Sequence, residues 1–453
     1  MTDAASSVAD RPSSLPRRRQ LLYAASSLGG EAVSQSRGAW LVYFYVEETG
    51  LLSLAIVGPL IFAARLVESV DDALIGYWSD RTRSRLGRRL PFILTATPFW
   101  GVFAALLFMP PEAGATAAAA WLFLLLVLTF LFSTLSSGPY EALLPEIAPT
   151  SAERVAISGA RVYFGAVGGL VGLAVSGLLV DRLGFAAMAT TMAVILVATR
   201  YLGTFGVWRQ ARASTQTAEL PLREALRATF ANVPFLRFLP SFVFFQLGLQ
   251  LLLGVLPFYV AAVLGRENEG TWVAILTATA IAVTLATVPI LARRASRTSK
   301  RRVFGRSMLL ASLVFPLLAF AGFLPGIPAE AQILAFMALA GVPIAGIYLF
   351  PSALTADIVD HDETLTGMRR EATYYGAQNF VEKTAGSLSP LLLTLLLLLG
   401  STADDPLGIR LAGPVAGAIV LAGFVVFRRY ELPDNVLAET RGERTSAPAG
   451  GRC

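Results

Sequence analysis

Three acidic residues lie close together within a long apolar stretch of this sequence, at positions 68, 71 and 72. Charged groups at membrane depth cost free energy, so acids that are retained there usually have a function. Arg65, Glu68 and Asp72 are spaced by three and four residues, and this spacing places them on one face of a helix. Arg65 can neutralise one carboxylate, while the others, Asp71 among them, remain available to bind a small cation.

The elements that carry these acids are predicted to be membrane-spanning helices. Hydrophobic residues make up 55% of the 453 residues and charged residues only 15%, and the mean hydropathy is +0.62. Soluble proteins rarely have this composition. Apolar runs of about 20 residues, each long enough to cross a bilayer core of about 30 Å, recur along the chain. Twelve such runs lie near residues 21–46, 53–79, 90–110, 117–145, 155–180, 184–207, 238–264, 271–293, 303–325, 330–358, 372–400 and 408–428.

Basic residues predict the orientation of these helices. With the N-terminus placed inside, most of the 37 basic residues fall in cytoplasmic segments, and only Arg182, Arg266 and Arg410 fall outside. We therefore expect a multi-pass protein of the cell inner (plasma) membrane with both termini in the cytoplasm. The net charge of +6 then indicates contact with the anionic inner leaflet, and no nucleic-acid partner is expected.

The sequence argues against an enzyme. One cysteine, Cys453, and one histidine, His361, cannot form a disulfide or a Cys/His metal cluster within the chain. Neither lysine, Lys300 nor Lys383, follows a glycine, so the phosphate-binding loop of ATP-driven pumps is absent. The G-x-S-x-G motif of serine hydrolases is also absent. We expect no cofactor other than a coupling cation, and a non-transporting sensor built on a transporter fold remains open.

The chain is predicted to fold as two six-helix halves, at 21–208 and 238–430, with a cytoplasmic tail at 1–20 and a disordered cytoplasmic tail at 431–453. The linker at 209–237 places Leu222, Leu226 and Phe230 on one face, which predicts a short amphipathic helix on the membrane surface. The halves resemble one another weakly, as in transporters with internal repeats. Short motifs at 142–143, 146–147 and 163–165 recur 211 positions later at 353–354, 357–358 and 374–376.

Other polar residues within the spans form a second cluster, which we expect to face a central cavity. Its members are Glu31, Arg37, Glu141, Arg161, Glu382 and Lys383. A run of hydroxyl residues at 133–137 can add neutral oxygen ligands. Sodium requires several such oxygens, whereas a proton requires only one acid, so both cations remain open. Arg200 lies close enough to the cytoplasmic end of its span to snorkel to the surface.

Residues 76–91 (GYWSDRTRSRLGRRLP) resemble the loop signature of the major facilitator superfamily. Together with the preceding residues 65–72 (RLVESVDD), they are similar to the glycoside-pentoside-hexuronide:cation symporters of that superfamily. The stretches at 138–146, 356–360 and 374–383 match the same family. The resemblance covers nearly the whole chain and implies an all-α membrane protein with twelve transmembrane helices in two six-helix halves.

The resemblance also implies a function and a set of site residues. The protein would be a monomeric secondary active transporter in the lipid bilayer, which couples sodium or proton entry to symport of a sugar or glycoside by alternating access. The cation would be bound by Glu68, Asp71, Asp72 and Thr134. The substrate would be bound by Glu31, Ser137, Glu141, Arg161, Tyr348, Gln378 and Lys383. Gating contacts would involve Arg65, Asp80, Gly87, Arg88, Glu146, Arg154, Asp357 and Arg370.

Two other transport functions remain open. Lysolipid symporters share the acids of the second helix and the lysine of the eleventh, so the substrate could be an amphiphile. The second open function is proton-coupled export. A largely apolar cavity beside Lys383 would favour an amphiphile, whereas carboxylates and hydroxyls around the cavity favour a sugar.

Overall fold

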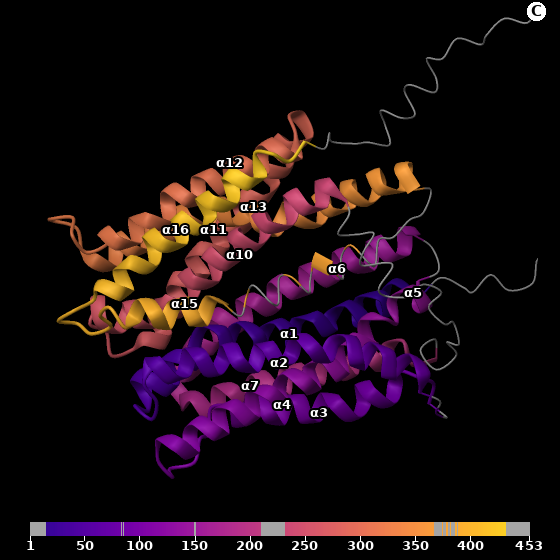
Figure 1. Cartoon of the computed structure of the whole chain (residues 1–453), viewed down its shortest axis with the longest axis horizontal. Helices are drawn as coiled ribbons and strands as arrows, with labels where there is room; N and C mark the ends of the chain where they lie inside the picture. The colour runs from indigo at the N-terminus through magenta and orange to yellow at the C-terminus, as the bar shows by residue number, and fades with distance from the viewer. Residues whose placement is uncertain are drawn as a thin grey trace, which may run out of the picture. The chain divides into compact units, whose positions relative to one another are not determined.

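The computed structural model describes residues 15–431, except 83, 85, 149–150, 210–231, 367–373, 375–376, 379–380, 382–385 and 387. Side chains are described for these residues apart from 69–81, 145–146, 151–152 and 154–155. Every regular element in this part of the chain is a helix (Figure 1). The chain divides into two compact units, Met1–Ala218 and Glu219–Cys453. Each unit is described by itself.

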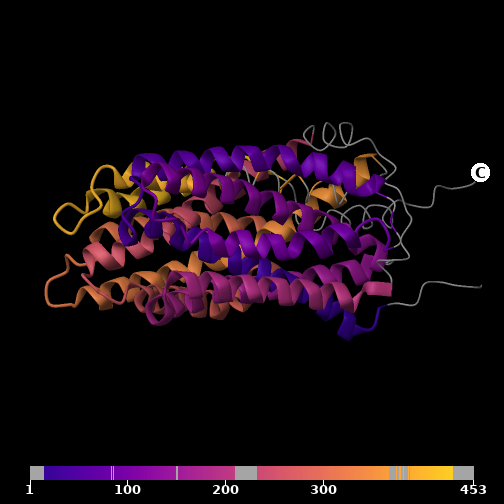
Figure 2. The same cartoon turned by 90° about the horizontal axis from the view of Figure 1, so that it is seen from below.

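The first unit consists of long helices that run side by side (Figures 1 and 2). They are α1 (Arg17–Tyr43), continued by the π-helix Phe44–Glu48, then α2 (Leu54–Arg81), α3 (Leu90–Leu106), α4 (Ala115–Glu141), the short α5 (Leu144–Ile147), α6 (Ser151–Leu170), the π-helix Val171–Val175 and α7 (Ser176–Gly206). Helix α1 packs against α6 and α7, and α4 packs against α2 and α3. Because short connections flank α3, helices α2 and α4 run in the same direction.

Glycines let α1 and α6 approach closely. A Cβ atom on Gly168 would lie 2.1 Å from the carbonyl oxygen of Leu28, and one on Gly172 would lie 2.5 Å from that of Ala32. No side chain fits at either position, so the two backbones are in direct contact. Small residues serve the same purpose where helices associate in membranes. This packing brings the polar residues of α1 next to those of α6.

The second unit is also helical throughout its described part. Its elements are α10 (Val233–Phe258), continued by the π-helix Tyr259–Val263, then α11 (Glu269–Arg297), α12 (Lys300–Val314), the 3-10 helix Phe315–Phe320, α13 (Ala329–Thr366), α15 (Leu388–Leu397) and α16 (Leu407–Phe427). Helix α10 packs against α16, α11 packs against α13, and α12 contacts both α13 and α16.

Seven helices in the described residues are long and apolar enough to cross a membrane. One of the seven runs from Ala156 to Gly206 and joins the expected spans five and six, although Gly184, with φ 80° and ψ 171°, interrupts its helical geometry. Helices α3 and α15 are apolar but shorter. The expected span at 372–400 is described only in part, with α15 as its continuous helical portion. The count of twelve spans therefore stays a prediction.

Several helix boundaries differ from those expected; α13, for example, ends at Thr366 rather than at 358. Helix α10 begins at Val233 rather than at 238, because the side chain of Asn232 accepts a hydrogen bond from the backbone N–H of Phe235 at 3.1 Å and caps the helix. Helix α4 ends at Glu141 rather than at 145, and the chain continues into α5. Most of the predicted linker helix lies outside the described residues. Apolar-run length locates helices but does not detect caps.

Candidate cation and substrate sites

An ion pair on α2 connects Glu68, a residue expected at the cation site, with Arg65, which was expected among the gating residues. The Arg65 Nη1 atom donates to the Glu68 Oε2 atom at 2.7 Å, and Glu68 is only 6% exposed. The two residues are three apart on one helix, as the sequence spacing predicted. The guanidinium of Arg65 also lies over the ring of Phe130 on α4, with its carbon atom 4.2 Å from the ring centre. This contact fixes the relative height of α2 and α4.

Thr134 lies one turn beyond Phe130 on α4, just as Glu68 lies one turn beyond Arg65 on α2. Since the two helices run in the same direction, we expect Glu68 and Thr134 to lie at about the same level. Thr134 is 4% exposed, and within the described part of the chain its hydroxyl oxygen has no hydrogen-bond partner. A buried hydroxyl without a partner is uncommon. Asp71 and Asp72 belong to α2, but their side chains lie outside the described set.

A second group of polar side chains lies between α1, α4 and α6. The Arg161 Nη2 atom donates to the Glu141 Oε1 atom at 3.0 Å, and the Arg161 Nε atom donates to the Ser27 hydroxyl at 3.4 Å. Glu31 lies one turn after Ser27 and is exposed; its Cγ atom is 3.5 Å from where a Cβ atom on Gly165 would stand. Three expected substrate ligands, Glu31, Glu141 and Arg161, are therefore brought together by helices that are distant in sequence.

Ser137 has a different environment from the one expected. Its hydroxyl accepts a hydrogen bond from the Arg200 Nη2 atom at 3.1 Å. Arg200 is 5% exposed and does not snorkel to the surface; its guanidinium carbon lies 4.5 Å from the ring centre of Tyr140 and 5.6 Å from that of Trp100. The aromatic faces and the hydroxyl keep this cation inside the unit. The sequence signal from which this contact could have been predicted is an arginine inside an expected span, with aromatic residues nearby in the sequence.

The expected substrate ligands of the second unit are less complete. Gln378 is 6% exposed, and its Oε1 atom accepts a hydrogen bond from the Thr355 hydroxyl at 2.6 Å. Tyr348 on α13 is 47% exposed. Lys383 lies outside the described residues.

Among the expected gating residues, Asp357 has a clear partner. The Lys300 Nζ atom lies 2.6 Å from both carboxylate oxygens of Asp357, which joins the start of α12 to α13 within the second unit. Gly87 lies in the turn before α3 with φ 89°, a conformation that favours glycine. Arg88 follows in the same turn. The side chains of Asp80, Glu146 and Arg154, and the whole of Arg370, fall outside the described set.

The side chains at these sites offer groups that can bind ligands. Carboxylate and hydroxyl oxygens on α2 and α4 suit a hard monovalent cation. An arginine, two carboxylates and a serine hydroxyl between α1, α4 and α6 suit a ligand with several hydroxyl groups. In the described part of the chain, no three His, Cys, Asp or Glu side chains are grouped so as to hold a metal ion.

Comparison with known proteins gives a consistent picture. A family model described as MFS/sugar transport protein matches residues 22–406. The isoprimeverose transporter of Lactiplantibacillus pentosus is 24% identical over 375 residues, which cover 80% of this chain and 76% of that protein. The sodium-dependent lysophosphatidylcholine symporter 1 of Xenopus tropicalis is 24% identical over 383 residues, with coverage of 73% and 70%.

Solved structures show the same fold. The crystal structure of the nucleoside transporter NupG matches with a TM-score of 0.63 at 14% identity, over 92% of this chain and 100% of that one. At this identity the match concerns the fold and not the substrate.

Proposed function

Because this chain belongs to the family of MFS/sugar transport proteins, and within it to the glycoside-pentoside-hexuronide:cation symporters, we propose that it couples entry of sodium or protons to symport of a sugar or glycoside. Its two halves, each with six membrane-spanning helices, alternate between outward-open and inward-open states around the bound substrate. The protein lies in the plasma membrane with both termini in the cytoplasm, acts as a monomer and requires no cofactor.

One observation carries the cation site. The ion pair of partly exposed Arg65 with buried Glu68 on α2, the contact of Arg65 with Phe130 on α4, and the buried Thr134 hydroxyl, which has no hydrogen-bond partner in the described part of the chain, support this site. The carboxylate and hydroxyl oxygens of these residues can coordinate a small cation. Asp72 follows Glu68 by one turn on the same helix and is the proposed second carboxylate ligand, with Asp71 beside it.

The substrate proposal is supported by the polar group between α1, α4 and α6. Arg161 bridges Glu141 and Ser27, and exposed Glu31 lies next to them. Sugars present many hydroxyl groups, which both donate to carboxylates and accept from a guanidinium. The family resemblance adds Tyr348, Gln378 and Lys383 to the proposed substrate contacts. A relative that carries isoprimeverose is consistent with this substrate class.

Transport by the purified protein in proteoliposomes tests cation coupling. Glu68→Gln and Asp72→Asn each remove one proposed ligand charge, and we expect each to reduce cation-driven accumulation by at least about tenfold, since one charged ligand is worth more than about 1.4 kcal/mol. Glu112→Gln is the matched control, because Glu112 is exposed in the loop between α3 and α4. Unchanged accumulation in both α2 variants would contradict the cation site.

A thermal-stability screen tests the substrate class. Sugars, glycosides and lysolipids are each added with and without sodium, because a ligand that binds the folded state raises its apparent stability. We expect sugars or glycosides to stabilise the protein, more strongly in the presence of the coupling cation. Stabilisation by lysolipids alone would instead support the amphiphile function carried by the Xenopus relative.

A further inference from the structure

A second guanidinium lies over the ring of Phe130, in addition to that of Arg65. The guanidinium carbon of Arg37, on α1, lies 4.9 Å from the ring centre, compared with 4.2 Å for Arg65. Phe130 itself is 2% exposed. Two positive charges from different helices therefore share one buried aromatic ring, directly beside the carboxylate of Glu68.

Among the described side chains, Arg37 differs from Arg65 and Arg161 in forming no ion pair. Arg65 pairs with Glu68 and Arg161 pairs with Glu141, whereas Arg37 forms no hydrogen bond or ion pair within the described part of the chain. An arginine side chain stays charged at any physiological pH. A charge in a membrane-spanning helix is costly, and contact with one aromatic ring offsets only part of that cost. The position of Arg37 thus requires an explanation beyond packing.

We propose that Arg37 is a specificity-determining residue that sets the net charge of the cation site and thereby its preference for monovalent ions. The proposal rests on the proposed function, because it requires a cation site on α2. By formal charge, the three acids of α2 at positions 68, 71 and 72 and the two arginines on Phe130 sum to a single net negative charge. One net negative charge matches sodium, lithium or a proton, whereas two would match a divalent ion.

Coulomb's law gives the size and the direction of the effect. For a cation about 10 Å from the Arg37 guanidinium, and an effective dielectric constant of about 20, this fixed positive charge weakens binding of a monovalent ion by roughly tenfold and that of a divalent ion by roughly a hundredfold. Arg37 therefore opposes divalent ions more than monovalent ones.

Cation titrations of the purified full-length protein, followed by thermal stability at constant ionic strength, test this role. For Arg37→Gln we expect the apparent Kd for sodium to fall by roughly tenfold and that for calcium by roughly a hundredfold, so the calcium preference rises by roughly tenfold. Arg37→Lys keeps the charge and should keep the wild-type preference. Arg182→Gln is the control, because Arg182 is exposed on α7.

The ratio of the two affinities separates an electrostatic role from a structural one. A residue that only packs against Phe130 would change the melting temperature without changing the ratio, and an unchanged ratio in Arg37→Gln overturns the proposal. Arg37→Met keeps an apolar stem and replaces the Gln variant if that variant does not fold. No response of the unaltered protein to any cation would contradict the proposed function as well, whereas a normal response with an unchanged variant ratio contradicts only the role of Arg37.

Discussion

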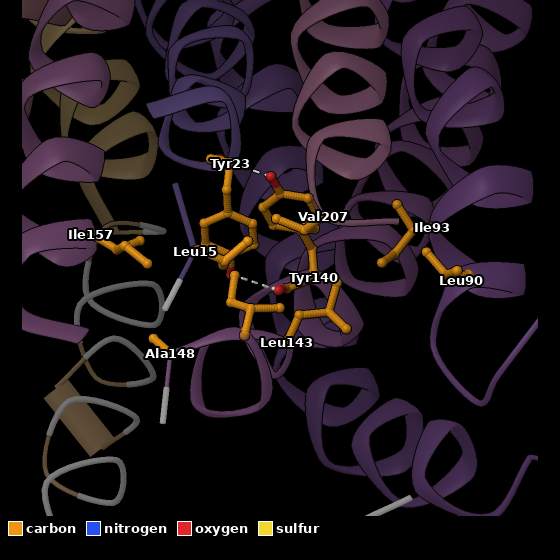
Figure 3. Packing of buried hydrophobic residues seen from close by; sticks show 10 residues of the cluster. Leu15, Tyr23, Leu90, Ile93, Tyr140, Leu143, Ala148, Ile157 and Val207 are labelled. Atoms are coloured by element: carbon orange, nitrogen blue, oxygen red, sulfur yellow. Dashed lines mark hydrogen bonds between the residues drawn. The ribbon is translucent and has the colours of Figure 1, made fainter. Parts of the chain in front are cut away.

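Tyr23 of α1 and Tyr140 of α4 form reciprocal hydrogen bonds from side chain to backbone. Each hydroxyl donates to the carbonyl oxygen of the other residue at 2.8 Å, and the two rings stack with their centres 4.6 Å apart (Figure 3). Both side chains are fully buried, in a cluster with Leu143 and Val207. Because Glu141 directly follows Tyr140, this contact fixes the end of α4 that carries a proposed substrate ligand.

Tyr140→Phe should destabilise the first unit without abolishing folding. The variant loses one buried hydrogen bond, which is worth about 1 kcal/mol. For a unit of about 200 residues this corresponds to a fall of roughly 2–4 °C in the melting temperature, measured on protein in detergent. Tyr163→Phe is the control, since Tyr163 is 68% exposed. Equal melting temperatures for the two variants would contradict the reciprocal contact as a source of stability.

Ser137→Ala should affect stability rather than substrate affinity, contrary to the sequence-based assignment of Ser137 as a substrate ligand. The substitution removes the hydroxyl that accepts from buried Arg200, and a lost hydrogen bond to a charged group costs about 1.5–3 kcal/mol. We expect a lower melting temperature and a KM for transport within about twofold of the wild-type value. Ser133→Ala, on the same helix, provides the comparison. A large rise in KM with unchanged stability would restore the role of Ser137 as a ligand.

Gly168→Ala and Gly159→Ala should have opposite effects although both lie on α6. A Cβ atom on Gly168 would stand 2.1 Å from a carbonyl oxygen of α1, whereas one on Gly159 meets nothing within 4 Å. The first variant forces α1 and α6 apart and should lose about 1–3 kcal/mol. The second gains helix propensity of up to about 1 kcal/mol. Circular-dichroism melting of both variants measures the difference, and a stable Gly168→Ala protein would refute the close contact.

Asp357→Asn should destabilise the second unit, because it removes the negative charge that pairs with the ammonium group of Lys300. Because the side chain of Asp357 is only 10% exposed, we expect a loss of about 1.5–3 kcal/mol in unfolding free energy. The exchanged pair Lys300→Asp with Asp357→Lys should recover part of that loss. Thermal unfolding measures stability, and transport assays show whether gating changes as well. No recovery in the exchanged pair would indicate that other contacts of Asp357 dominate.

Local spacing predicted the contact between Arg65 and Glu68 on α2. The two residues are three apart, so helix geometry alone brings them together. Apolar-run length located most helices to within a few residues. It misplaced the start of α10, because a cap at Asn232 has no signature in hydropathy.

Contacts between helices could not be predicted in this way. Tyr23 and Tyr140 are 117 residues apart, and Arg200 and Ser137 are 63 apart. The sequence indicated that Ser137 and Arg200 were polar residues inside spans, but both a surface position for Arg200 and a substrate contact for Ser137 were compatible with it. Only the packing of α1, α4 and α7 decides that they meet each other.

The sequence alone determined that this chain is a helical membrane protein with a charged helix face at Glu68, since both conclusions depend on composition and on spacing along one helix. Tertiary structure decided which partners those charges have. The ring of Phe130 on α4 receives Arg65 from α2 and Arg37 from α1, and no periodicity in the sequence specifies the rotation and height at which three separate helices pack. The electrostatic environment of the cation site is for this reason a property of the packed helices and not of the α2 segment.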